Sequence, residues 1–155
     1  MTRADLDAAL QSANMQAFLR VIRAGESGQN DDAYTVMFGG GHFDAPPWVH
    51  PHQPVDAAGL TSTAAGAYQF LGRTWDALVK QYGFEDFSPA NQDAAAVALI
   101  AGRGALTDVL AGWFDDAILL CGKEWASLPD SPYGQPTRTL AQARQTYSEN
   151  GGEFA

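Results

Sequence analysis

The acidic residue best placed for proton transfer is Glu26, which follows a helical run of apolar side chains. Residues 13–25 carry apolar side chains, including Met15 and Ile22, at the three-and-four spacing of an amphipathic helix. On the helical wheel Glu26 lies within about 20° of Met15 and about 40° of Ile22, so it shares the buried stripe. Burial raises the proton affinity of a carboxyl group, which suits a general acid near neutral pH. The alternative is a surface glutamate on a frayed last turn. The helical wheel by itself does not distinguish a partly buried acid from a surface glutamate.

A second candidate for substrate contact is a run of small and hydroxylated residues before an expected helix. The run begins with Ser62 and Thr63 and continues through alanines and Gly66 to Tyr68 and Gln69. Small side chains let a sugar polymer approach the backbone, an aromatic ring offers an amphipathic face, and an amide can both donate and accept hydrogen bonds. The alternative is a capped helix with Tyr68 in the core.

Three histidines raise the possibility of a metal site. His50 and His52 flank a proline, and His42 could supply a third nitrogen ligand to a zinc ion for peptide cleavage. A short-spaced pair in a proline-containing loop lacks the rigid geometry of zinc sites, so solvated loop histidines are the favoured interpretation. We therefore expect no metal and no cofactor.

The elements that must position these residues follow an α+β pattern that is mainly α-helical. After the helix at 13–25, residues 34–38 and 42–43 flank three glycines and predict a small hairpin. Residues 45–61 contain four prolines and predict an irregular surface loop. A second helix is expected from Gly66 to Tyr82, and a third from Ser88-Pro89 to Gly102 or Gly104. Short helices at 106–110 and 113–125, a loop at 128–136 and a last helix ending at Gly151 complete the pattern.

Composition limits the classes of function. The 155 residues are 46% hydrophobic and 17% charged, which predicts a single globular domain over residues 1–155. The net charge of -9 disfavours nucleic acid and anionic membranes as partners. Cys121 lies in an apolar run and is expected to be a buried thiol. No apolar run approaches the ~20 residues of a membrane span, and residues 1–7 do not resemble a secretory signal, so synthesis in the cytoplasm is expected.

Several short motifs, in order along most of the chain, together resemble the phage lambda endolysin family of lysozyme-like lytic transglycosylases. The motifs are the Phe18-Leu19 helix leading to Glu26, Val36-Met37-Phe38-Gly39-Gly40, Ser62-Thr63-Ala64-Ala65-Gly66-Ala67-Tyr68-Gln69, Asp86-Phe87-Ser88-Pro89 with Gln92-Asp93, Arg103-Gly104-Ala105-Leu106, and Trp125-Ala126-Ser127-Leu128-Pro129 with Tyr133-Gly134-Gln135. Glu26-Ser27 also resembles the Glu-Ser pair found more widely among lytic transglycosylases.

The resemblance implies a lysozyme-like fold with a substrate groove between two lobes. It implies that Glu26 is the acid and base, that Ser27 helps to position it, and that the loops 45–61 and 129–136 form lips over the groove. The expected substrate contacts are Ser27, Ser62, Thr63, Tyr68, Gln69, Tyr133 and Gln135. The implied partner is the glycan strand of peptidoglycan, reached in the periplasm by a monomer that depends on a separate pore-forming protein for export.

The reaction implied by the resemblance needs one carboxyl group. Most glycosidases use two carboxyls at a set separation, yet Asp31, Asp32 and Asp44 are weak candidates for the second, and Thr35 stands where T4-type phage lysozymes have aspartate. A lytic transglycosylase instead forms a 1,6-anhydro-muramic end without water. A hydrolytic muramidase, a zinc peptidase and a non-enzymatic wall-binding or phage structural module stay open as alternatives.

Overall fold

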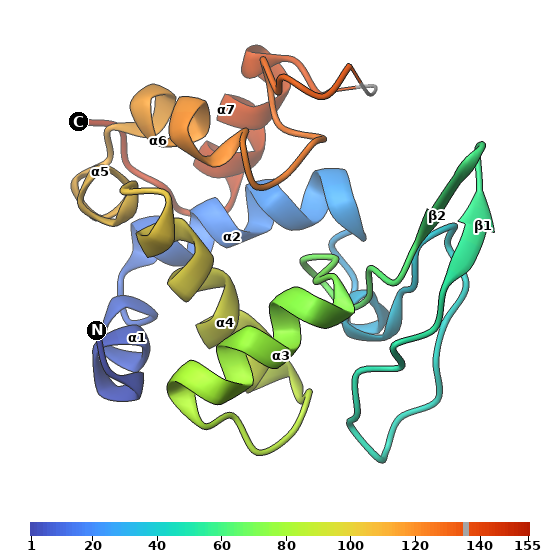
Figure 1. Ribbon diagram of the computed structural model, residues 1–155. Helices are drawn as coiled ribbons and strands as arrows, with labels where there is room; N and C mark the ends of the chain where they lie inside the picture. The colour runs from blue at the N-terminus through green and yellow to red at the C-terminus, as the bar shows by residue number, and fades with distance from the viewer. Residues whose placement is uncertain (135–136) are drawn as a thin grey trace.

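The computed structural model describes residues 1–134 and 137–155, and these residues form seven α-helices, one 3-10 helix and a two-stranded antiparallel sheet (Figure 1). In chain order the elements are α1 (Arg3–Ala9), α2 (Ala13–Glu26), η1 (Asp31–Thr35), β1 (Val55–Ala57), β2 (Leu60–Ser62), α3 (Gly72–Tyr82), α4 (Pro89–Gly102), α5 (Leu106–Ala111), α6 (Phe114–Cys121) and α7 (Leu140–Glu149). No helix in the described ranges has the length and apolar character needed to cross a bilayer.

Helix α2 runs through the centre of the helical part of the molecule and packs against α5 and α7 (Figure 1). The Ser12 hydroxyl caps its first turn by accepting from the amide of Met15 at 3.3 Å. The apolar stripe of α2, which includes Phe18 and Ile22, is fully buried. The helix predicted over residues 13–25 is therefore confirmed, with its last residue at Glu26.

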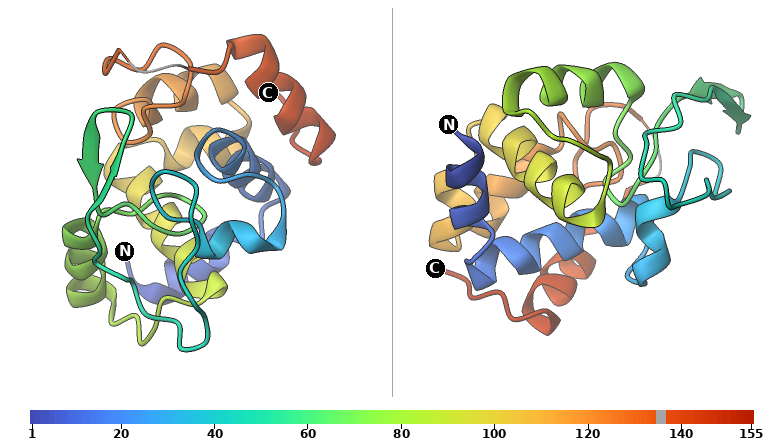
Figure 2. Two further views of the ribbon diagram at one scale, coloured as in Figure 1. Left: turned by 90° about the vertical axis from the view of Figure 1, so that its right-hand side faces the viewer. Right: turned by 90° about the horizontal axis from the view of Figure 1, so that it is seen from below.

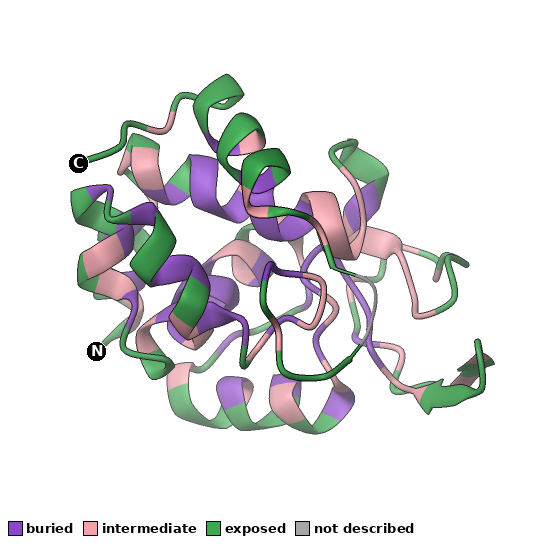
Figure 3. Cartoon of the chain, turned by 90° about the horizontal axis from the view of Figure 1, so that it is seen from above, coloured by how far each residue is buried: buried purple, intermediate pink, exposed green. Residues whose placement is uncertain are grey.

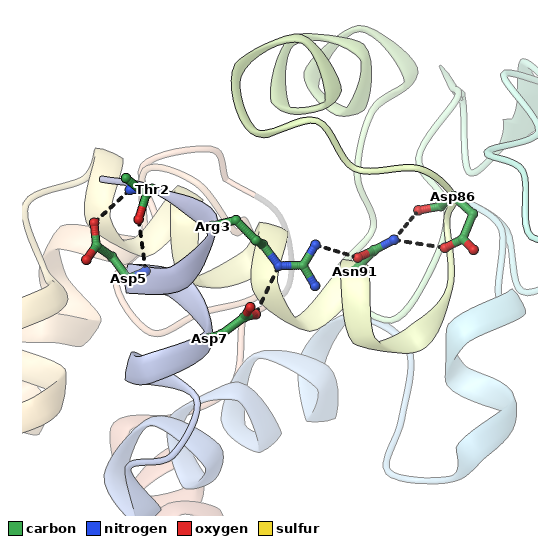
Figure 4. A network of polar contacts seen from close by, with 6 residues as sticks. All are labelled: Thr2, Arg3, Asp5, Asp7, Asp86 and Asn91. Atoms are coloured by element: carbon green, nitrogen blue, oxygen red, sulfur yellow. Dashed lines mark hydrogen bonds and ion pairs between the residues drawn. The ribbon is translucent and has the colours of Figure 1, made fainter.

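The first helix, α1, has no clear hydrophobic periodicity, but a capping box starts it. The Thr2 hydroxyl accepts from the amide of Asp5, and the Asp5 carboxylate accepts from the amide of Thr2 (Figure 4). Arg3 then donates to Asn91 on α4 at 2.7 Å, and Asn91 donates to Asp86 in the preceding loop. These bonds fix α1 and the start of α4 to each other.

The predicted hairpin at residues 34–43 is only partly correct. Its glycine turn exists, because the Met37 amide donates to Gly41 and Val36 pairs with His42, but this pairing is a single bridge. The two-stranded sheet lies instead at Val55–Ala57 and Leu60–Ser62, within the segment predicted to be irregular. The last proline of this segment is Pro54, so residues 55–62 can pair as strands. Ala58 and Gly59 both have positive φ, which is the geometry of a tight two-residue hairpin turn. The β1–β2 hairpin projects away from the helices (Figures 1 and 2).

The second predicted helix begins six residues later than expected, at Gly72. Residues 66–69 form a turn closed by pairing of Ala65 with Phe70, and both Gly66 and Gln69 have positive φ, which a helix does not allow. The other predicted helices are present, although α6 ends at Cys121 instead of continuing to residue 125. Cys121 is buried, as expected.

Buried residues are concentrated in the helical part of the molecule, whereas the β1–β2 hairpin is largely exposed (Figure 3). A single cluster of buried apolar residues extends from Leu6 to Tyr147. The end of α2 that carries Glu26 thus leaves the core where the turn at residues 66–69 and the segment after α6 meet it.

Candidate active site

A cleft of about 660 Å³ opens at the C-terminal end of α2. It is lined by residues 24–28, Asn30, Asp32, residues 36–40, His42 and Gln69. Of the predicted site residues, the structure brings Glu26, Ser27 and Gln69 together in this cleft.

The Glu26 carboxyl group is partly buried at the base of the cleft. Burial raises the pKa of Glu26 above its usual value, and hydrogen bonds from Ser127 oppose the rise by stabilising the charged form. The Ser127 hydroxyl donates to Glu26 Oε1 at 2.8 Å. A carboxyl group whose neutral form is favoured and whose orientation is fixed has the properties of a general acid.

Ser127 is a site residue that sequence reasoning missed. It lies in the segment between α6 and α7, 101 positions from Glu26, and its carbonyl accepts from the amide of Arg138. Gly25 allows the close approach, since a Cβ atom at that position would lie 2.4 Å from Ser127 Oγ. Ser127 belongs to one of the motifs that carry the family resemblance, but nothing in a single sequence pairs it with Glu26.

Ser27 holds the end of α2 to the neighbouring turn. Its hydroxyl donates to the carbonyl of Ala67 at 2.6 Å, so it makes no hydrogen bond with Glu26. The serine hydroxyl that contacts the Glu26 carboxyl group is that of Ser127 and not that of Ser27.

Gln69 also lines the cleft, and its side chain is held in place by its own turn. Its side-chain amide donates to the carbonyls of Val36 at 3.0 Å and Gly66 at 2.8 Å. These bonds join the turn at residues 66–69 to the segment that follows η1. The amide oxygen of Gln69 makes no hydrogen bond to another described residue.

Tyr68 is not a lining residue, which corrects the expectation drawn from the resemblance. Its ring is 1% exposed, because the turn directs it into the core, and its hydroxyl donates to Asp93 at 2.6 Å. Tyr34 donates to the same Asp93 oxygen at 2.9 Å. Desolvation raises the pKa of Asp93, while the two hydroxyl donors lower it. Tyr68 is therefore a core residue.

Gln92 is the buried residue that connects the parts of the site. Its Oε1 accepts from the amide of Ala67 at 2.9 Å, and its Nε2 donates to the carbonyls of Phe87 and Tyr34. Helix α4 thereby fixes the positions of the turn at residues 66–69 and of η1. Gly66 faces Gln92 so closely that a Cβ atom would lie 2.4 Å from Oε1.

Ser62, Thr63 and Tyr133 do not line the Glu26 cleft. Ser62 and Thr63 line a second cavity of about 520 Å³ at the base of the β1–β2 hairpin. Tyr133 is 55% exposed, and its hydroxyl donates to the carbonyl of Lys123 at 2.6 Å. Gln135 lies outside the described residues, as does Pro136 of the second predicted lip.

The three histidines have protein partners. His50 is buried, its Nδ1 accepts from the amide of His52, and its Nε2 therefore donates to the carbonyl of Phe70 at 2.8 Å. His52 Nε2 lies 2.8 Å from Asp76, and His42 Nδ1 lies 2.8 Å from the Thr35 hydroxyl. In the part of the chain that the structure describes, no three histidine, cysteine or acidic side chains are arranged to hold a metal ion.

The cleft contains one acidic side chain besides Glu26 among the described residues, and it is Asp32. Asp32 belongs to η1 and is exposed. Asp31 and Asp44 are exposed as well, but neither lines the cleft. The arrangement can thus support proton transfer by Glu26, with Asp32 as the candidate second carboxylate.

Known proteins resemble this chain in sequence and in structure. A family model described as Endolysin matches residues 16–154. The endolysin of Escherichia phage lambda is 39% identical over 144 residues, which cover 88% of this chain and 90% of that protein. The endolysin of Escherichia phage P2 is 41% identical over 108 residues, which cover 68% of this chain and 66% of that protein.

Two solved structures support the same relationship. A structure of bacteriophage lambda lysozyme complexed with a chitohexasaccharide has a TM-score of 0.86 at 37% identity, covering 92% of this chain and 97% of that one. A further structure of lysozyme from bacteriophage lambda has a TM-score of 0.81 at 35% identity, with the same coverage of 92% of this chain and 97% of that one. The predicted mainly α, lysozyme-like α+β fold is confirmed.

Proposed function

Because the chain belongs to the endolysin family, we propose that it lyses bacterial cell walls by cleaving peptidoglycan glycan strands as a lytic transglycosylase, with Glu26 as acid and base. The observation that carries the proposal is the partly buried carboxyl group of Glu26, held by Ser127 at the base of a cleft. A similar lysozyme was solved with a chitohexasaccharide, which supports a glycan as the ligand of this cleft.

In the proposed reaction Glu26 carries out both proton transfers. The protonated carboxyl group donates to the oxygen that links N-acetylmuramic acid to the next sugar, and this glycosidic bond breaks. The resulting carboxylate accepts the proton of the C6 hydroxyl of the muramic sugar as that oxygen bonds to C1. Glu26 returns to its acid form, and the product ends in a 1,6-anhydro sugar with no water consumed. The raised pKa of Glu26 favours the form that starts this cycle.

We propose that Ser27 and Gln69 contact the glycan in the cleft and that Tyr133 and Gln135 contact it from the second loop. Gln69 supports this proposal because its side-chain oxygen is left to accept from a sugar hydroxyl or acetamido group. The whole chain would act as one catalytic domain in the periplasm, with a separate pore-forming protein providing passage.

Mass spectrometry of muropeptides released from purified peptidoglycan tests the reaction. We expect 1,6-anhydro ends, which are lighter by one water than hydrolysed ends, and no incorporation of ¹⁸O from labelled solvent. Chelator should leave the rate of release unchanged. Hydrated ends carrying ¹⁸O would refute transglycosylation, and a loss of activity restored by zinc would favour a peptidase.

A hydrolytic muramidase is the second candidate, because Asp32 lines the same cleft as Glu26. In that case Asp32 would act as base or nucleophile across the sugar ring. Asp32→Asn distinguishes the two: transglycosylation predicts only a modest loss of activity, whereas a muramidase would lose roughly 10²-fold or more. Asp31→Asn and Asp44→Asn are matched controls, since neither residue lines the cleft.

A further inference from the structure

The second cavity, at the base of the β1–β2 hairpin, has a lining that suits an anion. Besides Ser62 and Thr63 it is lined by Arg73 and by the apolar side chains of Pro54 and Leu71, and the rest of its lining is His52, Thr61 and Gly72. Arg73 extends from the first turn of α3 and is exposed. The cavity is not part of the Glu26 cleft and has no role in the proton transfers proposed above.

Arg73 differs from the other arginines because no residue in the described ranges accepts a hydrogen bond from its guanidinium group. Each of the other six arginines donates at least one hydrogen bond to a protein acceptor. Arg73 makes neither a hydrogen bond nor an ion pair with any residue in the described ranges. The nearest acid on its own helix, Asp76, already pairs with His52 at 2.8 Å. In a protein of net charge -9, a guanidinium group without a bound acceptor gives a local positive potential on a surface that is negative overall.

Two hydroxyl groups in the cavity also have hydrogens left to donate. Ser62 Oγ accepts from the amide of Ala64 at 3.1 Å, and Thr63 Oγ1 accepts from the amide of Gly72 at 2.9 Å. Neither hydroxyl donates to another described residue, so both O–H groups can point toward a ligand. A guanidinium group and two hydroxyl donors beside apolar walls match a carboxylate attached to a small aliphatic group.

The cavity and the cleft share one stretch of backbone. Residues 63–65 follow β2 directly, the carbonyl of Ala64 accepts from the amide of Phe38 at 2.9 Å, and Ala65 pairs with Met37. Phe38 and Met37 line the Glu26 cleft, whereas Ser62 and Thr63 line the cavity. Residues that line the two sites are therefore joined by direct backbone contacts, and a peptide of four residues can extend up to about 13 Å from its attachment point.

We propose that this cavity binds a carboxylate of the peptide stem that branches from the glycan strand, with Arg73 as its main determinant. The proposal rests on the function proposed above, because it takes peptidoglycan as the substrate. It assigns Ser62 and Thr63 to recognition of the stem and leaves recognition of the sugar to the Glu26 cleft. The lactyl group of a muramic sugar without a stem also carries a carboxylate, so the test must distinguish these two sources.

Calorimetric titration of the Glu26→Gln protein with three soluble ligands separates these sources without cleavage. The ligands are a chitohexasaccharide with no carboxylate, peptide-free glycan chains with lactyl carboxylates, and glycan chains of the same length that carry stems. We expect stem-bearing chains to bind about three- to tenfold more tightly than the other two ligands. Arg73→Gln should remove this preference and leave the affinity for the chitohexasaccharide unchanged. Lys80→Gln, on the same helix but outside the cavity, is the matched control.

Each result decides the proposal. A preference that survives Arg73→Gln, or an equal loss of affinity for all three ligands, would overturn it. Loss of affinity for the peptide-free chains alone would assign Arg73 to the lactyl carboxylate and overturn recognition of the stem. In both cases binding of the chitohexasaccharide would leave the proposed function standing. Failure to bind any of the three glycans would instead contradict the proposed function and this inference with it.

Discussion

At the scale of single residues, two opposing effects set the pKa of the Glu26 carboxyl group. The protein interior favours its neutral form, and the Ser127 hydroxyl favours its charged form while fixing its orientation. Glu26→Gln keeps the shape and can still accept from Ser127, but it cannot transfer a proton. We expect lysis of permeabilised Gram-negative cells to fall by about 10²–10⁴-fold with an unchanged circular dichroism spectrum. Activity within tenfold of the wild type would contradict the assignment.

The same substitution should affect stability in a pH-dependent way. The pKa of Glu26 is raised in the folded state, so its contribution to stability is fully present below the unfolded-state pKa and is lost as pH rises through the folded-state pKa. Above its folded-state pKa the wild type must therefore keep a partly buried charge that the Glu26→Gln variant avoids. In thermal unfolding, the stability of Glu26→Gln relative to wild type should increase as pH rises from acid to alkaline values. A difference that does not change with pH would contradict the role of burial.

Ser127→Ala tests the positioning of Glu26. Removing the hydroxyl eliminates a hydrogen bond that lowers the pKa of Glu26, so the alkaline limb of the kcat/KM profile should move to higher pH. The maximal rate should fall by roughly tenfold, because orientation is lost. Ser27→Ala is the control, since Ser27 donates to a backbone carbonyl and should leave the pH profile in place. Identical profiles for wild type and Ser127→Ala would show that Ser127 is only structural.

Sequence reasoning selected Glu26 as the candidate acid, but it did not find Ser127, whose hydroxyl orients the Glu26 carboxyl group. Glu26 could be selected because it follows an apolar stripe on one helix, which is a local pattern. Ser127 contacts it across 101 positions of sequence, and Tyr68 points into the core because of a turn whose positive φ at Gln69 has no signal in residue type. Contacts of this kind depend on tertiary packing, so a single sequence does not contain them in readable form.

At the scale of elements, the turn at residues 66–69 connects α4 to the cleft, because Ala67 bonds to Gln92 and Gln69 lines the cleft. Gly66 has a φ of +86° and lies against Gln92 and Phe87. Gly66→Ala should cost about 2–4 kcal/mol, from a strained backbone together with overpacking, and should reduce activity by displacing Gln69. Gly83 also has positive φ, but a Cβ atom there would meet nothing within 4 Å, so about 1–2 kcal/mol is expected for Gly83→Ala. Equal losses in chemical denaturation would contradict the packing argument.

Helix α2 was predicted correctly from its apolar stripe, and α4 from the Ser88-Pro89 start signal. In the structure the Ser12 hydroxyl caps α2, whereas the Ser88 side chain makes no capping hydrogen bond and α4 is buried on most of its sides. The sheet was missed because β1 and β2 have three residues each, too short for an alternating pattern, and follow four prolines. Helix α3 was placed too early because the small residues before Gly72 are compatible with a helix, whereas the hydrogen bonds of Gln69 and Gln92 stabilise a turn.

At the scale of the whole molecule, net charge sets how the protein approaches its substrate. The chain has a formal charge of -9, and peptidoglycan stems carry free carboxylates, so long-range repulsion opposes their encounter. Arg73 offers attraction only at short range. The net charge could be predicted from composition. That Arg73 is the one arginine without a hydrogen-bond acceptor among the described residues could be found only from the positions of its neighbours in the structure.

Salt should therefore accelerate the enzyme on intact peptidoglycan. The screening length falls from about 30 Å at 0.01 M ionic strength to about 8 Å at 0.15 M, which removes most of the long-range repulsion. We expect the initial rate on purified sacculi to rise by at least about twofold over this range, mainly through KM, since electrostatic steering acts on encounter. Binding of an uncharged chitohexasaccharide to Glu26→Gln should not change with salt and serves as the control. A rate that falls steadily over the same range would show that local attraction outweighs the field of the whole chain.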